Sequence, residues 1–286
     1  MLNRLLEQDF ETFRPLLEQF PTTEYRDWSL LFTHGWNRID ATVGFGLVDE
    51  GRPVGYLGTI QTERTIAGVT FRNVNLSTWF VLKDYRAHSL DPQRAVLEYD
   101  NCVSVGHTII PQVVKRYESI GYRGFDFFTR LMFFNPAAIL SRGDGIETLI
   151  GRAVAAMCDD VERQLIGDHE PFGCVPLLFR TTAGDRCLVI AQRVIRRYKG
   201  MRLATAHCLY VSNREFFAAT NAVTRNAIMS TLNCRLLACD ERYMLGTTPL
   251  LSLKIPMITP RMSRNNIGFD PMLLDNLYTE LVLMRY

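Results

Sequence analysis

Apolar residues recur every three or four positions between Phe10 and Phe20. This spacing places them on one face of an α-helix. Asp9 is a suitable N-cap, and Pro21 ends the run. We therefore expect a first helix here and a second, short helix over residues 23–34.

From residue 43 the apolar period changes from helical to alternating. Residues 43–47 and 54–60 alternate on either side of a turn at Gly51, which is the pattern of a β-hairpin. Residues 71–81 alternate in the same way after a turn at Gly68. The pattern predicts three antiparallel strands.

Helices and strands alternate after the third strand. The sequence predicts a helix over 92–99, a strand over 103–110, a helix over 111–120 and a strand over 125–134. A strand, helix, strand order favours a parallel neighbour. The strand over 103–110 is therefore expected to lie parallel to the strand over 71–81.

The second half of the chain repeats this order with different residues. The predicted elements are a helix over 145–165, strands over 175–180, 188–194 and 203–211, a helix over 215–232 and a strand over 234–239. Ser212 and Glu215 have the spacing of a capping box before the second of these helices. Two interpretations stay open: a duplicated unit, or a common arrangement that recurs by chance.

The segment after Pro249 is expected to form a tail. It contains Pro256, Pro260 and Pro271, and proline is disfavoured within a central strand. We expect it to pack over the surface and to end in a short helix over 272–283. The predicted fold class is α/β (α+β), with a mixed, mainly antiparallel sheet flanked by helices. Two domains are expected, over residues 1–140 and over residues 141–286 with the tail.

The composition is that of a folded protein with a small-molecule partner. Of 286 residues, 47% are hydrophobic and 22% are charged, which excludes wholesale disorder and a long coiled coil. The formal net charge of +2 provides no broad electrostatic surface for nucleic acid or for an anionic membrane. Neither partner is expected.

The beginning of the chain and its cysteines indicate a cytoplasmic protein. Glu7 and Asp9 lie where a signal peptide needs an apolar region. The most apolar run, over 131–140, covers about half of the ~20 residues that a membrane-spanning helix requires. The seven cysteines are odd in number and include no Cys-x-x-Cys pair. They predict neither a disulfide framework nor a zinc site, and no metal is expected.

The junction after the third strand is the candidate site for chemistry. The chain contains no Walker A loop, no dinucleotide-binding glycine fingerprint, no zinc-protease helix and no nucleophile elbow. A strand that feeds a small-residue loop and then a helix presents backbone N–H groups to a phosphate or pyrophosphate. Here Val81 ends the strand, and Tyr85-Arg86-Ala87-His88-Ser89-Leu90 follows.

This order resembles the GNAT superfamily of acyl-CoA-dependent N-acyltransferases. In that family a strand ending in Val precedes Tyr-Arg and a glycine-rich loop whose amides hold the coenzyme A pyrophosphate. Ala87 and Ser89 stand here in place of both glycines. The resemblance implies an acyl-CoA donor, acetyl-CoA or longer. The residues that it places on the donor are Val81, Arg86, Ala87, His88, Ser89 and Leu90.

A second motif supports the first. Tyr117-Glu118-Ser119-Ile120-Gly121-Tyr122 resembles the family's later motif, Tyr-Glu-x-x-Gly-Phe. The resemblance implies that Tyr117 is the general acid that protonates the departing thiolate. His107, on the strand over 103–110, is our candidate for the base or for an acceptor contact. The likeness covers roughly residues 5–135, and the order of elements extends it to a second, degenerate GNAT-like unit.

Two hypotheses of different classes follow. The first is an N-acyltransferase that moves an acyl group from acyl-CoA, or from an acyl carrier protein, to a small-molecule amine. The alternative is a non-catalytic GNAT-fold scaffold or ligand-binding protein that has lost coenzyme A binding. Trp79 or Phe80 filling the cleft between the fourth and fifth strands of the family's sheet favours the alternative. A homodimer is left open.

Overall fold

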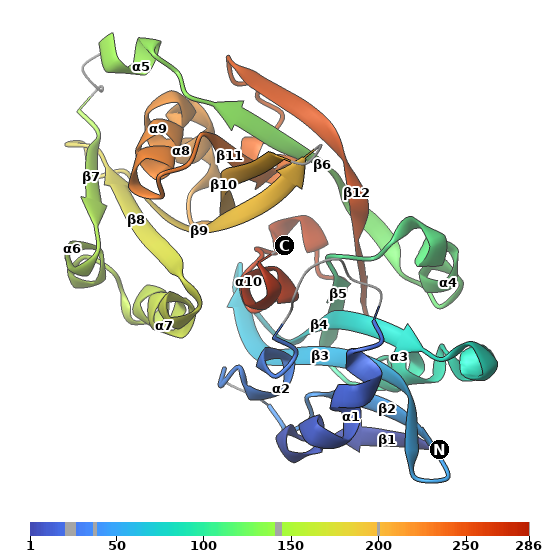
Figure 1. Cartoon of the computed structure of the whole chain (residues 1–286). Coiled ribbons are helices and arrows are strands. Elements are labelled where there is room, and N and C mark those ends of the chain that lie inside the picture. The colour runs from blue at the N-terminus through green and yellow to red at the C-terminus, as the bar shows by residue number, and fades with distance from the viewer. Residues whose placement is uncertain (21–26, 37–38, 141–144, 199–200, 286) are drawn as a thin grey trace. The chain divides into compact units, whose positions relative to one another are not determined.

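The computed structural model describes residues 1–20, 27–36, 39–140, 145–198 and 201–285 (Figure 1). The chain divides into two compact units. Unit 1 comprises Met1–Phe125, Ile258–Leu274 and Tyr278–Met284, and unit 2 comprises Asp126–Met257 and Asp275–Leu277 with the last residues of the chain. The units divide after Phe125, and the tandem domains expected over 1–140 and 141–286 stay a prediction.

Unit 1 is a sheet with helices on both faces. Its strands are β1 (Leu2–Leu5), β2 (Gly44–Asp49), β3 (Arg52–Ile66), β4 (Val69–Val81), β5 (Cys102–Gly106) and the second part of β12 (Ser252–Asn265). Its helices are α1 (Phe10–Leu17), α2 (Leu30–Thr33), α3 (Asp91–Val96), α4 (Val114–Ser119) and α10 (Glu280–Met284). Residues 21–26, where the first helix was expected to end and the second to begin, lie outside the described residues.

The strand order in unit 1 is β1-β2-β3-β4-β5-β12. Neighbours run antiparallel, except that β4 and β5 run parallel. The predicted hairpin, the third strand and the parallel neighbour are therefore confirmed. The crossover from β4 to β5 contains α3, as the strand, helix, strand order requires.

The two faces of this sheet bury different sets of residues. Val74 and Leu76 of β4 pack with α3 and α4 residues, whereas Phe71 packs with Phe269 and Leu274 from the C-terminal part of the chain. Alternate residues of a strand point to opposite faces. Positions 71, 73 and 75 of β4 therefore share the face that the C-terminal segment covers.

The strand order in unit 2 is β6-β11-β10-β9-β8-β7. Its strands are β6 (Arg123–Phe133), β7 (Glu147–Ile150), β8 (Cys174–Arg180), β9 (Arg186–Tyr198), β10 (Met201–Val211) and β11 (Leu236–Asp240). Its helices are α5 (Ala137–Leu140), α6 (Arg152–Ala156), α7 (Asp160–His169), α8 (Arg214–Ala219) and α9 (Asn221–Thr231). Strands β10 and β11 run parallel, and the other neighbours run antiparallel. The predicted class, a mixed, mainly antiparallel sheet flanked by helices, is confirmed.

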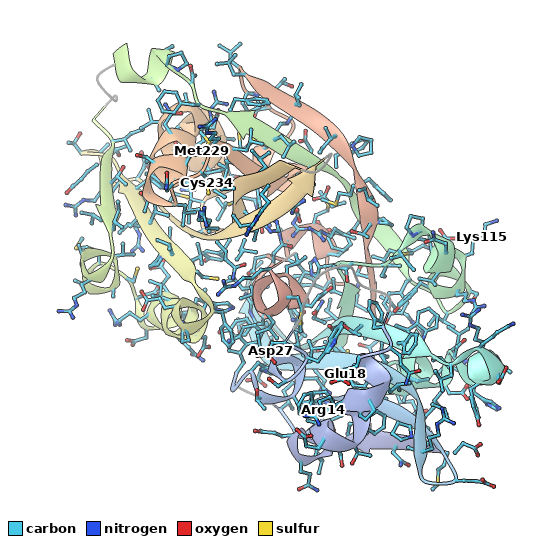
Figure 2. The ribbon with its side chains drawn as sticks, in the orientation of Figure 1. Arg14, Glu18, Asp27, Lys115, Met229 and Cys234 are labelled. Atoms are coloured by element: carbon cyan, nitrogen blue, oxygen red, sulfur yellow. The ribbon has the colours of Figure 1, made fainter. Side chains whose placement is uncertain are left out.

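The core of unit 2 lies between its sheet and the α8–α9 pair. Phe217, Ile228 and Met229 from these helices pack with apolar residues of β8 to β11. Figure 2 shows Met229 and Cys234 at the end of α9, where the Cys234 amide donates to the Met229 carbonyl at 2.8 Å. All seven cysteines are free, and every one except Cys234 is buried.

The prediction of a single helix over 145–165 is wrong. The structure has β7 first, then α6 and α7. Gly151 has a φ of +64°, a left-handed value that ends the strand and that glycine adopts without strain. Asp159 then caps α7 by accepting from the Glu162 amide, and Glu162 reaches back to the Asp159 amide. These two local signals outweigh the helical spacing.

The helix expected over 215–232 is divided in two, and its cap lies one residue later than predicted. Asn213 Oδ1 accepts from the Phe216 amide at 2.9 Å, while Ser212 Oγ accepts from the Leu188 amide of the neighbouring strand. The helix breaks at Thr220, whose hydroxyl donates to the Phe216 carbonyl. A threonine hydroxyl that bonds back to the preceding turn is a known cause of such bends.

The prediction of a surface tail after Pro249 is wrong in part. Residues Ser252–Asn265 form β12, and Met262–Asn265 pair with β5. Both internal prolines, Pro256 and Pro260, precede the residues paired with β5, so neither removes a hydrogen bond from that ladder. The final helix expected over 272–283 is shorter, α10 over Glu280–Met284, and a 3-10 turn over Pro271–Leu273 precedes it.

Gly44 allows β2 and β3 to pair closely. A Cβ at this position would lie 2.6 Å from the Leu57 carbonyl oxygen and 3.3 Å from Gly58 Cα. Both are backbone atoms of β3, so the strands must move apart. We expect Gly44→Ala to lower the free energy of unfolding of unit 1 by about 1–3 kcal/mol, as measured by urea denaturation. Gly167→Ala is the control, because Gly167 is helical with open space around its Cα, and this change is expected to stabilise α7.

Candidate functional site

The parallel strands β4 and β5 stop pairing before β4 ends. The last paired residues are Leu76 and Gly106, while β4 continues to Val81. The chain after Gly106 turns back, and Ile109 packs against the Gly106 Cα. The two strands therefore separate at this point and leave the final residues of β4 without a β5 neighbour.

A β-bulge lies on β4 immediately beyond the separation. The register with β3 shifts between Leu57 and Gly58, which oppose Trp79 and Ser77. Thr78 is the extra residue, with a φ of +45° that is uncommon for a β-branched side chain. A bulge re-aims the backbone, so the peptide groups around Thr78 leave the regular ladder where the strands separate.

The predicted donor loop forms a 3-10 helix over Lys83–His88. Val81 and Ser89 are buried, Leu90 is half-buried, and Arg86, Ala87 and His88 are exposed. Ser89 has a φ of −63°, and Ala87 is also outside the positive-φ region. Neither position needs the conformational freedom of glycine, which explains how Ala87 and Ser89 occupy this loop without strain.

Ser89 fastens the loop to strand β4 and helix α4. Its carbonyl accepts from Trp79 Nε1 at 3.0 Å, and its hydroxyl accepts from Arg116 Nη1 at 3.1 Å. His88 lies beside Asp91, with Nδ1 and Oδ2 3.2 Å apart. The loop thus presents Arg86 and His88 to solvent while its far end is fixed.

Tyr117 lies under the end of β4. Its ring, 3% exposed, meets Trp79 edge to face at 5.5 Å and Tyr122 at 5.1 Å. Burial raises the pKa of the Tyr117 hydroxyl, a hydrogen bond with Gln93 lowers it, and the charge of Glu280 raises it again. The hydroxyl is therefore protonated at neutral pH, as a proton donor must be.

His107 follows the last residue of β5 directly. Its side chain is buried, and its carbonyl accepts a hydrogen bond from Arg261 of β12. It lies beyond the end of β5 rather than within the strand expected over 103–110. That strand ends early because the chain turns to bring Ile109 against Gly106.

Sequence reasoning missed a buried carboxyl at the same place. The Glu280 amide donates to Asn75 Oδ1 at 3.0 Å, and Glu280 Oε1 accepts from Thr108 Oγ1 at 3.0 Å. Asn75 is held in turn by its donation to the Val105 carbonyl at 3.3 Å. The sequence around Glu280 does not identify it as a site residue, because its partners Asn75 and Thr108 are far away along the chain. An acid within the apolar run 280–284 is the one available signal.

Unit 2 has a related strand separation that its own chain closes. Strands β10 and β11 pair at Thr205–His207 and Leu236–Ala238, and the register of β10 shifts between Cys208 and Tyr210. At the extra residue, Leu209, the carbonyl accepts from the Tyr243 hydroxyl and from the Asn276 amide, both at 2.9 Å. The carbonyl at the bulge of β10 therefore has partners within unit 2.

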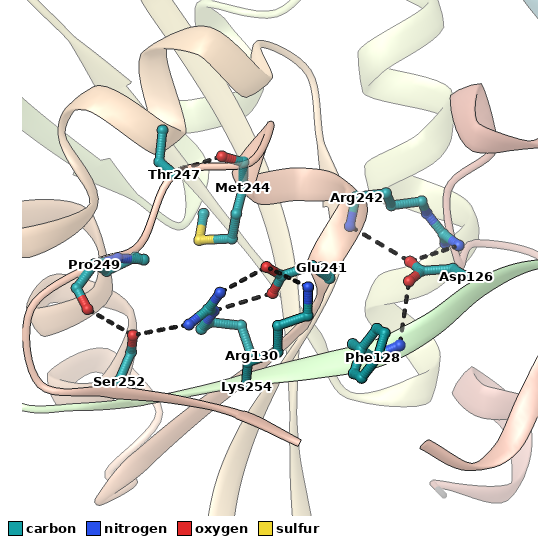
Figure 3. Close-up of polar contacts among 10 residues, drawn as sticks. All are labelled: Asp126, Phe128, Arg130, Glu241, Arg242, Met244, Thr247, Pro249, Ser252 and Lys254. Carbon is teal, nitrogen blue, oxygen red and sulfur yellow. Dashed lines mark hydrogen bonds and ion pairs between the residues drawn. The ribbon is translucent and has the colours of Figure 1, made fainter. Parts of the chain in front are cut away.

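A buried ionic cluster lies beside that closure, and Figure 3 shows its Arg242–Asp126 and Arg130–Glu241 pairs. Arg242, with a fully buried side chain, lies 2.9 Å from Asp240 and 3.6 Å from Asp126, and it donates to Asn276 Oδ1 at 2.7 Å. Burial works against the Arg242 charge, but its acidic neighbours outweigh this and raise the pKa of the guanidinium. Beside it, Arg130 donates to both oxygens of Glu241. This cluster organises unit 2.

A surface hollow of about 590 Å³ lies elsewhere in unit 1. Residues of β1, α1 and the β2–β3 turn line it, and it includes none of the predicted site residues. Among the described residues no group of three or more His, Cys, Asp or Glu side chains could hold a metal ion. In the same part of the chain no helix is both long and apolar enough to span a membrane.

No protein-family model matches the chain. No curated protein matches it in sequence. Solved structures do match it. A GCN5-related N-acetyltransferase from Anabaena variabilis gives a TM-score of 0.59 at 9% identity over 93% of this chain and 72% of its own.

Two further structures show the same likeness. A GCN5-related N-acetyltransferase from Kribbella flavida gives a TM-score of 0.55 at 14% identity, over 93% of this chain and 71% of its own. N-myristoyltransferase from Saccharomyces cerevisiae, solved with bound myristoyl-CoA, gives 0.51 at 9% identity, over 97% of this chain and 84% of its own. At these identities the likeness concerns the fold. The chain has the fold of the GCN5-related N-acetyltransferases.

Proposed function

We propose that this protein is an N-acyltransferase that transfers an acyl group from acyl-CoA to an amine. The observation that carries the proposal is the separation of β4 from β5 next to the bulge at Thr78, with Tyr117 beneath it. Separating strands suit an extended donor arm, because the final residues of β4 have no β5 partner and so present a strand edge.

The proposed donor contacts are the residues of the loop and its approaches. Arg86 and His88 are exposed, and the side chains of both offer N–H donors to a pyrophosphate. Val81 and Leu90 provide apolar contacts, and Ala87 and Ser89 allow a close approach of the backbone. The donor is acetyl-CoA or a longer acyl-CoA, and an acyl carrier protein is an alternative source of the same thioester.

The proposed chemistry is direct transfer. A neutral amine attacks the thioester carbonyl, and the new C–N bond forms as the C–S bond breaks. A backbone amide near Thr78 polarises the carbonyl oxygen. Tyr117 gives its proton to the departing thiolate, so free coenzyme A leaves as the thiol. His107 is the proposed acceptor contact, at the end of β5.

One active site per chain is proposed, in unit 1. The Leu209 carbonyl of unit 2 accepts hydrogen bonds from Tyr243 and Asn276. Strand β10 also leads into the Asn213 cap of α8 without an intervening loop. Both features favour a single donor site in the chain. Unit 2 is then a degenerate partner domain, and the acceptor is a small-molecule amine.

A second candidate function is a ligand-binding or scaffold protein without transferase activity. The observation that favours it is Trp79. Its ring packs against Tyr117 and its Nε1 donates to the Ser89 carbonyl, so this side chain stands between the end of β4 and the donor loop. An acyl-CoA must displace Trp79 or pass beside it.

Calorimetry separates the two candidates. We expect acetyl-CoA or a longer acyl-CoA, up to myristoyl-CoA, to bind at one site per chain, and a primary amine to release the coenzyme A thiol from it. Glucosamine, lysine and spermidine are suitable probes of three amine classes. Failure of every acyl-CoA and of acyl carrier protein thioesters to bind would falsify the transferase proposal and favour the Trp79 alternative.

A further inference from the structure

Glu280 lies across the opening between β4 and β5. Its amide is bonded to the Asn75 side chain, one residue before the last paired position of β4. Its carboxyl is bonded to Thr108, two residues after the last paired position of β5. The two hydrogen bonds therefore anchor this residue to both strands at the point where they separate.

One oxygen of this carboxyl is available for chemistry. Glu280 is 0% exposed, and Oε1 accepts from Thr108. Oε2 is also buried and has no hydrogen-bond partner within the part of the chain that the structure describes. Leaving a buried carboxyl oxygen unsatisfied costs free energy. A structural role alone would be served as well by a glutamine or an apolar residue.

Glu280 and Tyr117 lie on opposite faces of the β4–β5 pair. Tyr117 packs with Val74 and Leu76 on the α3–α4 face, whereas Asn75 points to the other face of β4 and meets Glu280 there. Asn75, which accepts from the Glu280 amide, directly precedes Leu76, which packs with Tyr117, and the charge of Glu280 raises the pKa of the Tyr117 hydroxyl. An acid and a base on either side of a bound thioester is the arrangement that acyl transfer to an amine requires.

We propose that Glu280 is the general base of this site and takes the proton of the acceptor amine on Oε2. This inference rests on the proposed transferase function. In the step, the amine nitrogen bonds to the thioester carbon and passes one proton to the Glu280 carboxylate, while the C–S bond breaks and the thiolate takes a proton from Tyr117. The carboxyl then returns its proton, and the Tyr117 phenolate regains one, through solvent. In total, the amine loses one proton and the coenzyme A thiolate gains one.

The surroundings of Glu280 suit this role near neutral pH. Burial raises the pKa of the Glu280 carboxyl to about 7, against the lowering effects of its own amide, of Thr108, of Asn75 and of the Arg261 charge. Titratable groups on the neighbouring elements include Arg72 on β4, Cys102 on β5, Arg261 on β12 and Tyr117 on α4, with His34 after α2 and His107 after β5. A base works best when its pKa lies close to the working pH.

The test is the pH dependence of acyl transfer. In the wild type, kcat/KM for the amine should rise with pH through a midpoint near 7, because the carboxylate is the active form. Glu280→Gln should lower kcat about 10²–10³-fold and abolish this rise, leaving only the increase due to ionisation of the amine itself. The acyl-CoA dissociation constant should stay unchanged, because Glu280 is not among the proposed donor contacts.

Two further variants keep the test decisive. Glu63→Gln removes an exposed carboxyl on β3 of the same unit and should leave the profile unaltered. Thr108→Val removes the hydrogen bond that favours the charged carboxylate, so the midpoint should move to higher pH. A wild type that transfers to none of the three probe amines overturns the transferase function and this role with it. An active wild type whose profile and rate survive Glu280→Gln overturns the role of Glu280 alone.

Discussion

Replacing Arg242 with methionine is expected to lower the free energy of unfolding of unit 2 by about 3–5 kcal/mol, because it leaves buried carboxylates without their cation. Asp240 lies 2.9 Å from this guanidinium and is 1% exposed, and Asp126 lies 3.6 Å from it and is 4% exposed. Urea denaturation at pH 7, followed by circular dichroism, measures the change. Methionine keeps most of the volume of the arginine side chain, so the lower free energy of unfolding comes from the missing charge rather than from a cavity.

Arg180→Met is the matched control for this prediction. Arg180 also makes an ion pair in unit 2, with Glu147 at 2.6 Å, but both side chains are more than a third exposed. Exposed pairs contribute roughly 0–1 kcal/mol. If the two variants lose the same free energy of unfolding, the buried cluster stabilises unit 2 no more than an exposed ion pair does. The loss in Arg242→Met should also shrink at low pH, where Asp240 and Asp126 become protonated and no longer need a cation.

Tyr117→Phe is expected to lower the turnover of acyl transfer about 10²–10³-fold while the acyl-CoA dissociation constant changes little. The phenyl ring can keep the edge-to-face contacts with Trp79 and Tyr122, so the packing survives and only the proton donor is lost. Release of the coenzyme A thiol measures turnover, and calorimetry measures donor affinity.

Tyr122→Phe controls for the loss of a buried hydroxyl in the same aromatic group. Tyr122 is fully buried, and its hydroxyl lies 2.6 Å from Ser104 Oγ. This variant should lose stability and keep turnover. If Tyr117→Phe retains wild-type turnover, the departing thiolate takes its proton from another source, and Tyr117 has no part in the mechanism.

Local patterns were sufficient to predict most of unit 1. The alternation around Gly51 and over 71–81 set the hairpin and the third strand, and the helix after them implied the parallel β5. These signals are local, because period and turn residues act over a few positions. The same reasoning failed at 145–165, where Gly151 and the Asp159 cap divided an apparently continuous helical pattern.

The sequence predicted the part of the candidate site on the α3–α4 face of β4, but not the part on the opposite face. The loop after Val81 and the motif at Tyr117 carry a recognisable order of residues, so sequence reasoning reached them. Glu280 belongs to no recognisable motif, because its partner Asn75 is 205 residues away along the chain. Strand β12 was missed for a related reason, because its prolines argued against a strand that its pairing with β5 permits. Contacts of this kind follow from topology rather than from any local period.

Unit 1 is assembled from three separate stretches of chain, the last of which is Tyr278–Met284. During synthesis the first stretch must therefore wait for nearly all of unit 2 to be made before β5 gains β12 and Asn75 gains Glu280. Such distant pairings are slow to form and leave a strand edge open in the meantime. Unit 2 can reach most of its own contacts earlier. The part of unit 1 around Asn75 and Glu280 should therefore be completed last.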